Sequence, residues 1–444
     1  MIRFVTRWPH LVGRDGPSRR RGPDSDGSAN RPCLALVLGL LAAAVTANGQ
    51  SVLTPPPQVP VTPPAVQEIE SEKAGYIDFG DAVPGVPQNV QPFLVGPIVL
   101  HPHVSYQFLY ANGIQSGPGV AHSSIIQNVS PGLTVALGKN LTLDYTGTWT
   151  LYSNPAFQNS YNQSASLQGG YRYGDWVLGL SQTYNRSDST LIQTAQQTEQ
   201  ETYSTGLTGS YHFNSVLSVD LSANQTFTYY NMTTNTFANT QSWSTMDWLN
   251  YQFWPRLDAS VGVGGGFDDV SVGPNDTYEM YQARVGWRAT DKIGFQVHGG
   301  MEDLQFLNSG IGDLVTPIYG ANIGYKPFQF TALSFDANRA VSTSPFEDED
   351  TESTSLTGSL NQRLLKKLYL NVSGGYSWVT YVASSTALAV NRRDQGYTVG
   401  VNLSWTFLER GTAALTYQNS ENSSTLPGYA FRSDQYGFTL GYRY

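Results

Sequence analysis

Charged side chains, the groups that could do chemistry, are few and share one position in a two-residue repeat. Only 13% of the 444 residues are charged, about half of the usual share in soluble proteins. In the alternating segments they fall on the same side as Gly, Ser, Thr, Asn and Gln, opposite a side that is almost entirely apolar. Successive side chains of a strand point to opposite faces, so these residues would line one polar face. We call nine of them the wall charges: Arg172, Asp220, Asp258, Arg284, Arg288, His298, Glu302, Asp336 and Arg363.

The wall charges allow two interpretations, and the sequence favours neither. Mixed charges on the wall of a pore would tune which solutes pass. The same charges could instead form salt bridges that brace a lumen conducting little. In the hairpin around Thr290-Asp291, the pattern places Arg284 opposite His298 or one step away, with Glu302 farther along the same wall.

The reactive side chains do not form a catalytic or metal-binding pattern. Nucleophilic catalysis needs an oriented base beside the nucleophile, and a metal site needs at least three ligands. His101 and His103 share a face but lack a clear third ligand. The acidic run Glu347–Asp350 could attract Ca²⁺, but its ligand spacing is irregular, so a solvated loop is favoured. We therefore predict no enzyme activity, no metal and no cofactor.

Alternation continues almost without interruption from Ile98 to the last residue, most clearly in Tyr397–Phe407. Short connections, such as Gly174-Asp175 and Lys326-Pro327, alternate with longer polar ones, such as Ser187–Thr198. Short turns at one end and longer loops at the other are typical of outer-membrane barrels. The pattern predicts an all-β, transmembrane, antiparallel up-and-down β-barrel of about 18 strands, with a range of about 16 to 20.

Composition supports this fold class and limits the partners. Mean hydropathy is −0.28, and no apolar run reaches the roughly 20 residues of a membrane helix. Aromatic residues make up 12% of the chain, which suits a barrel wall; the competing all-β alternatives are a sandwich array and a β-helix. After residue 47, 18 basic residues stand against 31 acidic ones, a net charge of −13. This balance excludes a nucleic-acid partner.

The sequence divides into three parts. Residues 1–47 combine an Arg-rich region, a short apolar run and a small-residue site, which predicts a signal peptide with a long n-region. Cys33, the single cysteine, lies in this part. Residues 48–97 are Pro-rich and predict a periplasmic linker; alternatively, 75–97 fold into the lumen as a plug. Residues 98–444 form the predicted barrel.

The final strand carries the strongest signal for closure. One face holds a row of apolar residues and ends on the last residue of the chain: Tyr436, Phe438, Leu440, Tyr442 and Tyr444. A closed barrel has no edge, so this strand must pair with the one that begins near Ile98. We therefore expect Tyr442 to lie paired and close to Tyr106. Tryptophans beside short turns and beside longer loops predict two aromatic girdles.

These features resemble a known family. The final strand is similar to the C-terminal assembly signal of outer-membrane β-barrels, which the barrel-assembly machinery recognises. Val45-Thr46-Ala47, the strand pairs from Ile98, the run Ser242–Tyr251 and the ending Gly441–Tyr444 resemble the β-barrel porin families of Gram-negative outer membranes. The resemblance implies a location in the outer membrane, among its lipids. The best-known porins fold one long loop into the channel, and no loop here is long enough for that.

Two functions remain open from the sequence. The first is a porin-like passive channel for small hydrophilic solutes, because a barrel of about 18 strands leaves an aqueous lumen. The second is a non-conducting structural or interaction barrel linked to surface polysaccharide export or attachment.

Overall fold

The structure is a closed β-barrel. The computed structural model describes residues 51–53, 75, 77, 79, 82, 93–231, 237–386, 392–408 and 410–444. The predicted signal peptide, and almost all of the predicted linker before Phe93, lie outside the described residues. The strands are β1 (Phe93–Val95), β2 (Ile98–Gly117), β3 (Val120–Leu137), β4 (Leu141–Tyr152), β5 (Ser160–Tyr173), β6 (Trp176–Leu191), β7 (Gln196–His212), β8 (Leu217–Tyr230), β9 (Thr240–Trp254), β10 (Leu257–Val270), β11 (Asp276–Thr290), β12 (Ile293–Phe306), β13 (Leu314–Phe328), β14 (Thr331–Thr343), β15 (Glu349–Leu365), β16 (Leu368–Ala383), β17 (Arg393–Phe407), β18 (Gly411–Ser424) and β19 (Phe431–Arg443).

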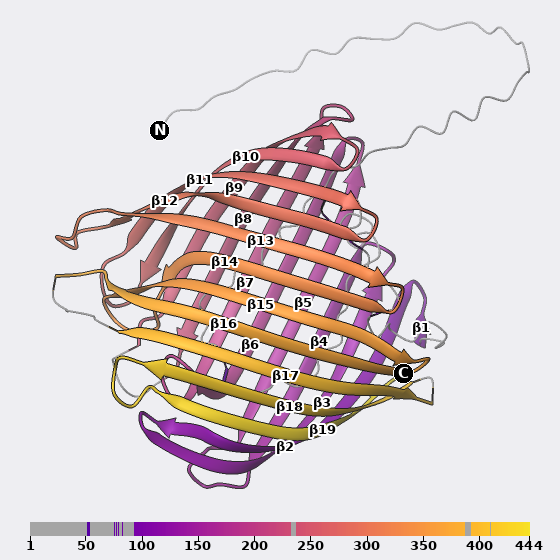
Figure 1. Cartoon of the computed structure of the whole chain (residues 1–444), viewed down its shortest axis with the longest axis vertical. Coiled ribbons are helices and arrows are strands. Elements are labelled where there is room, and N and C mark those ends of the chain that lie inside the picture. The colour runs from indigo at the N-terminus through magenta and orange to yellow at the C-terminus, as the bar shows by residue number, and fades with distance from the viewer. Residues whose placement is uncertain are drawn as a thin grey trace, which may run out of the picture. The chain divides into compact units, whose positions relative to one another are not determined.

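Each strand from β2 onward pairs antiparallel with the next, and β19 pairs back with β2 to close a ring of 18 strands (Figure 1). Leu440 pairs with Tyr106 and Tyr442 with Val104, so the predicted closing contact is confirmed. The amide of the last residue, Tyr444, donates to the carbonyl of Pro102 at 2.9 Å. The predicted fold class and strand number are therefore confirmed. Among the described residues, no helix is long and apolar enough to cross a membrane.

The outer face of the ring is an apolar belt. Apolar side chains of the predicted outward parity are exposed, including Val261 and Leu415, each at 62%. The tryptophans exposed on this face include Trp149, Trp176, Trp243, Trp254, Trp287 and Trp378. Some stack with rings on the next strand, as Trp287 does with Phe295. Exposed apolar surface of this extent needs lipid around it.

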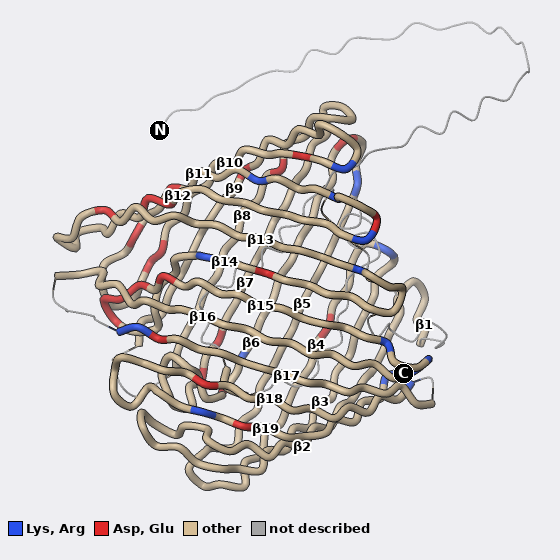
Figure 2. The backbone as a smooth tube through the Cα atoms, in the orientation of Figure 1, with Lys and Arg blue, Asp and Glu red and all other residues tan. Residues whose placement is uncertain are grey.

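We call the end with the tight turns and Tyr444 the turn end, and the opposite end the loop end. Acidic residues gather toward the loop end (Figure 2). Two predicted connections differ from the structure. The turn expected at Lys326-Pro327 lies at Gln329-Phe330, because a register shift between Tyr325 and Phe328 accommodates the proline, which has no amide donor, within β13.

The second difference concerns the predicted loop Ser187–Thr198. Most of it is strand, since β6 continues to Leu191 and β7 starts at Gln196. Cross-strand pairs such as Ser189 with Thr198 keep the hairpin regular. Polar residues therefore mark the part of this hairpin beyond the lipid belt rather than a loop.

Candidate functional site

The candidate site is the inner face of the barrel, and the wall charges lie on it. The register places Arg284 opposite His298, as predicted, and Asp336 opposite Asn322. Arg172, Arg288 and Arg363 take inward positions near the turn end. Glu302 lies toward the loop end and is only 6% exposed. Whether these residues select solutes stays a prediction.

Three strands bring one group of wall charges together around Arg284. Its Nη2 donates to Asn250 Oδ1 at 2.8 Å and lies 3.6 Å from Asp220 Oδ2. Its guanidinium also lies 4.4 Å from the ring centroid of Trp248. Asp220 accepts a further hydrogen bond from Ser210 Oγ at 2.7 Å. In this patch the charges brace the wall, which is the second of the two interpretations offered by the sequence.

Other inward charges are bound in a similar way. Asn322 Nδ2 donates to Asp336 Oδ1 across the strand pair. Arg363 Nη2 donates to the carbonyl of Lys366 at 3.1 Å and lies over the ring of Phe330. The inner face toward the turn end is thus a hydrogen-bonded polar surface.

The apolar outer face and the polar inner face of the ring together identify the class of fold. An exposed apolar belt surrounds a closed wall whose inner side is polar and hydrogen-bonded. Closed barrels of this kind cross outer membranes, because no backbone donor or acceptor is left unpaired in lipid. The chain is an outer-membrane β-barrel.

Comparison with known proteins gives only structural likenesses. No protein-family model matches the chain, and no curated protein matches it. The outer membrane protein opdK from Pseudomonas aeruginosa shares 10% identity with a TM-score of 0.42, covering 78% of this chain and 98% of its own. OccK2 (OpdF) from the same organism shares 9% identity with a TM-score of 0.44, covering 78% of this chain and 98% of its own. OccAB3 from Acinetobacter baumannii shares 9% identity with a TM-score of 0.41, covering 78% of this chain and 99% of its own. Such values say nothing about function, and the fold assignment rests on the strand pairing itself.

The loop end holds contacts that the sequence did not predict, beginning with residues 51–53. The amide of Val52 donates to the carbonyl of Thr190 at 2.9 Å, and Gln435 Nε2 donates to the carbonyl of Val52 at 2.6 Å. Val52 is 2% exposed and Leu53 is 9% exposed. They pack in an apolar cluster inside the ring that contains Leu109, Ala111, Ile114, Ile126, Phe157 and Phe431. The signal was present in the sequence, because Leu109 and Ile126 are apolar at inward positions.

Residues near the turn end also contact the inner wall. The backbone of Gly75 lies against Gly294, and the side chain of Ile77, 8% exposed, lies beside Gly294 and Gly324. Most of residues 75–97 before Phe93 lies outside the described residues, so the predicted plug stays a prediction. β1, within the predicted linker, pairs with the start of β2.

Arg392 ties together loops from opposite sides of the mouth. Its Nη1 donates to the carbonyl of Gln193, in the β6–β7 turn, at 2.9 Å. Its Nη2 lies 2.6 Å from Asp394 Oδ2, and its guanidinium lies over the rings of Tyr381 and Tyr429. Because β6 and β17 are far apart in the ring, this contact spans the mouth. The expectation that no loop is long enough to fold into the channel by itself stays a prediction; this contact instead joins two short connections across the mouth.

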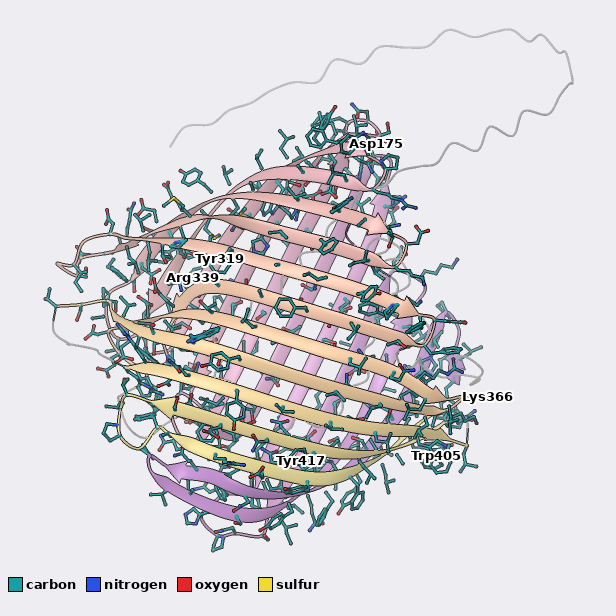
Figure 3. All side chains as sticks on the ribbon, viewed as in Figure 1. Asp175, Tyr319, Arg339, Lys366, Trp405 and Tyr417 are labelled. Atoms are coloured by element: carbon teal, nitrogen blue, oxygen red, sulfur yellow. The ribbon has the colours of Figure 1, made fainter. Side chains whose placement is uncertain are left out.

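The wall has a seam between β13 and β14 near the loop end. Their pairing stops at Tyr319 and Arg339, which lie side by side in Figure 3. Beyond this point β13 pairs only with β12, and β14 pairs only with β15. Arg339 Nε donates to the carbonyl of Pro317 at 3.1 Å, and its Nη2 lies 3.0 Å from Glu352 Oε2. Pro317 has no amide to offer a partner strand, so the free edge of β13 ends its pairing here.

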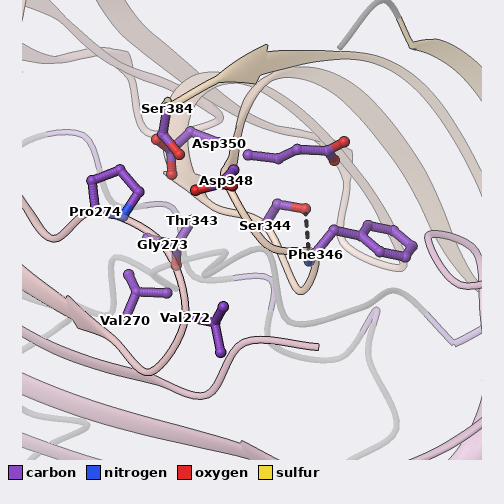
Figure 4. A pocket seen from close by; sticks show the side chains of 11 residues that line it. Val270, Val272, Gly273, Pro274, Thr343, Ser344, Phe346, Asp348, Asp350 and Ser384 are labelled. Carbon is purple, nitrogen blue, oxygen red and sulfur yellow. Dashed lines mark hydrogen bonds between the residues drawn. The ribbon is translucent and has the colours of Figure 1, made fainter. Parts of the chain in front are cut away.

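Past the seam, the end of the β14–β15 hairpin turns into the mouth. We call Thr343–Asp350 the tip. Phe346 forms an isolated bridge with Phe237 of the β8–β9 connection, with ring centroids 5.4 Å apart. The amide of Ala238 donates to the carbonyl of Pro345 at 2.9 Å. Figure 4 shows the tip facing the β10–β11 connection across a small pocket lined by Gly273 and Pro274.

Carboxyl groups crowd this interface. Asp268 and Asp276 pair across β10 and β11 on the inner face, and Glu302 lies on β12. Asp350 meets them from the tip. Asp268, Asp276 and Asp350 are 8%, 2% and 4% exposed, and each has one carboxyl oxygen without a hydrogen-bond partner. Among the described residues, no group of His, Cys, Asp and Glu has the geometry to hold a metal ion.

Proposed function

We propose that this barrel is a porin-like passive channel for small hydrophilic solutes. The observation that carries the proposal is the division of the wall into an apolar outer face and a hydrogen-bonded polar inner face. A ring of 18 strands is wide enough to leave an aqueous lumen. Inward groups such as Ser210, Asn250 and Ser260 are buried and hydrogen-bonded to their neighbours, so they give the wall a polar inner side. The proposal assigns no reaction, metal or cofactor to the chain.

The proposal includes the partners of a membrane barrel. The exposed belt would contact outer-membrane lipid. The outward residues of β19 would serve as the signal for the barrel-assembly machinery, since Tyr436, Leu440 and Tyr442 are about half exposed on the outer face. Residues 1–47 would be removed as the signal peptide. Small solutes would be the partners of the lumen.

One observation favours the alternative of a non-conducting structural or interaction barrel. Val52, Leu53 and the Arg392 contact occupy the mouth, which narrows the route through the lumen. Such a barrel would present its loops to surface polysaccharide during export or attachment. The two proposals differ in one measurable property, which is ion flow.

Single-channel recording of the purified protein in a planar bilayer tests the proposal. We expect discrete openings whose size and ion selectivity change in Arg284→Ala and Glu302→Ala, because both side chains lie on the inner face. Glu279→Ala is the matched control, because Glu279 is exposed on the outer face and should leave both properties unchanged. A folded barrel, shown by circular dichroism, that never opens would support the non-conducting alternative.

A further inference from the structure

The carboxyl-rich contact between the tip and the inner wall points to a controlled opening. We propose that the tip of the β14–β15 hairpin is a pH-dependent gate at the loop-end mouth, docked when its carboxyl contacts are protonated and released when they ionise. This rests on the proposed function, because a gate presupposes a lumen that conducts. It adds a regulation that the passive channel alone does not have.

The seam makes the tip a separate unit that can move. Residues beyond Arg339 on β14 have no partner on β13, so the only ladder that joins them to the wall runs through β15 to β16. The Arg339–Glu352 ion pair marks the base of the movable part, and both side chains are partly exposed. Because this end of the hairpin is attached only on the β16 side, it can bend at the seam together with the paired end of β16, without opening the rest of the ring.

Docking has favourable contacts that are small and local. The Phe237–Phe346 ring pair and the hydrogen bond from Ala238 to Pro345 join the tip to the β8–β9 connection. The amide of Ser384 donates to the carbonyl of Asp348 at 2.9 Å. These contacts are few, so one or two buried charges can offset them.

Repulsion between ionised carboxyl groups at this interface would oppose docking of the tip. The charges that act on Asp350 among the described residues are those of Asp268, Glu302 and Glu349, and all are acidic. Asp276 faces the same group from β11, and the Tyr278 hydroxyl lies nearby. Among the described residues, the cation that acts on Glu349 is Arg392, which is already bound to Asp394. Ionising this interface while the tip is docked would therefore place like charges together in a site with little water.

The direction of the pH dependence follows from Asp350, which lies in the tip and away from the lipid belt. Burial first, and then the charges of Asp268, Glu302 and Glu349, raises its pKa from the ordinary 3.8 to about 8. A carboxyl whose pKa is raised by docking favours the docked state fully below pH 3.8. This advantage is lost as the pH rises to about 8, so the mouth should open over that interval.

Conductance at two pH values tests the gate. We expect openings several-fold larger at about pH 8 than at about pH 5. Asp350→Asn cannot ionise, so its conductance should stay near the low-pH value at both. Asp268→Asn should weaken the pH dependence. Asp269→Asn is the matched control, because Asp269 follows Asp268 on the opposite face of β10 and should behave as the unmodified protein.

A reversible lock provides a second test. Phe237→Cys with Phe346→Cys places two thiols at an antiparallel bridge, where Cα atoms lie about 4.5–5.5 Å apart, within disulfide range. The oxidised protein should remain at the low conductance at high pH, and a reductant should restore the opening. Equal conductance at both pH values, or no effect of the lock, would overturn the gate and leave the channel intact.

Spin labels at Glu347→Cys in the tip and Ser309→Cys in the β12–β13 loop report docking without any current. Their distance should change between the two pH values in the unmodified background and stay constant with Asp350→Asn. If the barrel never conducts but this distance changes, the proposed function fails while the pH-dependent docking stands. A distance that does not change with pH overturns the docking itself.

Discussion

The wall near the turn end and the mouth at the loop end use the same kinds of residues for opposite purposes. Near the turn end, Asp220 and Arg284 each have partners, and the pairing of neighbouring strands continues from hairpin to hairpin. At the mouth, Asp276 and Asp350 are buried with unpartnered oxygens, and the β13–β14 pairing stops. Lipid forces every backbone group to be paired, whereas the water-facing mouth permits free edges. The comparison teaches that the strands are paired on both sides where lipid surrounds the wall, and that the unpaired edges of β13 and β14 lie beyond the lipid belt.

The largest effect should come from placing a charge in the lipid belt. Val261→Arg puts a cation at an outward position that is 62% exposed, and we expect a loss of about 2–4 kcal/mol in the free energy of unfolding. Gln282→Arg, on the inner face, is the matched control and should cost under about 1 kcal/mol, because water reaches that side. Denaturant titration in lipid vesicles measures both. Similar losses for the two variants would contradict the assignment of faces.

Breaking the braced wall should have the next largest effect. Asp220→Ala removes the carboxylate, on a side chain that is 4% exposed, that accepts from the Ser210 hydroxyl and lies 3.6 Å from Arg284 Nη2, and we expect a loss of about 1–3 kcal/mol in the free energy of unfolding. The same titration checks it. Asp350→Ala at the mouth is the comparison, and it should be neutral or stabilising, because it removes repulsion rather than a partner. If Asp350→Ala proved the more damaging, the contrast between the two regions would fail.

Releasing the mouth should change conductance more than stability. Arg392→Gln removes the ion pair with Asp394 and the contacts with Tyr381 and Tyr429. We expect a larger single-channel conductance, together with a loss of stability of about 1–2 kcal/mol. Arg393→Gln, at the next position and on the outer side, is the control for charge. An unchanged conductance would show that the Arg392 contact does not limit flow.

The apolar contact of the N-terminal residues should have the smallest effect on stability. Val52→Asp places a carboxylate in the cluster with Leu109 and Ile126, so residues 51–53 should leave the mouth. The barrel itself should keep its free energy of unfolding within about 1 kcal/mol, since no wall strand is altered. Conductance should rise. A marked loss of stability would instead make these residues part of the wall.

Sequence reasoning recovered the features that lipid imposes. Alternation, turn spacing and the final strand predicted the strand number and the closure of the ring, with Tyr442 paired and close to Tyr106. It missed the contacts at the loop-end mouth, which lies beyond the lipid belt. The contacts of Val52 with Thr190 and of Arg392 with Gln193 join segments far apart in the chain, and no periodic pattern records such pairs. The seam was also hidden, although Pro317 at the edge of β13 is a signal that could have been used.

The pairing of β2 with β19, the first and last wall strands, has a consequence for how the ring can be built. The ring of His101 contacts the carbonyl of Tyr444 at 3.1 Å, and Phe93 stacks on the ring of Tyr444. The last strand must therefore pair with a strand near the start of the barrel. This contact has the largest sequence separation of any strand pair in the wall, so we expect it to form most slowly. It also makes the starting point of the ring arbitrary. A circular permutant that joins Tyr444 to Phe93 and opens the chain at Gly174-Asp175 should reach the same barrel by a different order of assembly.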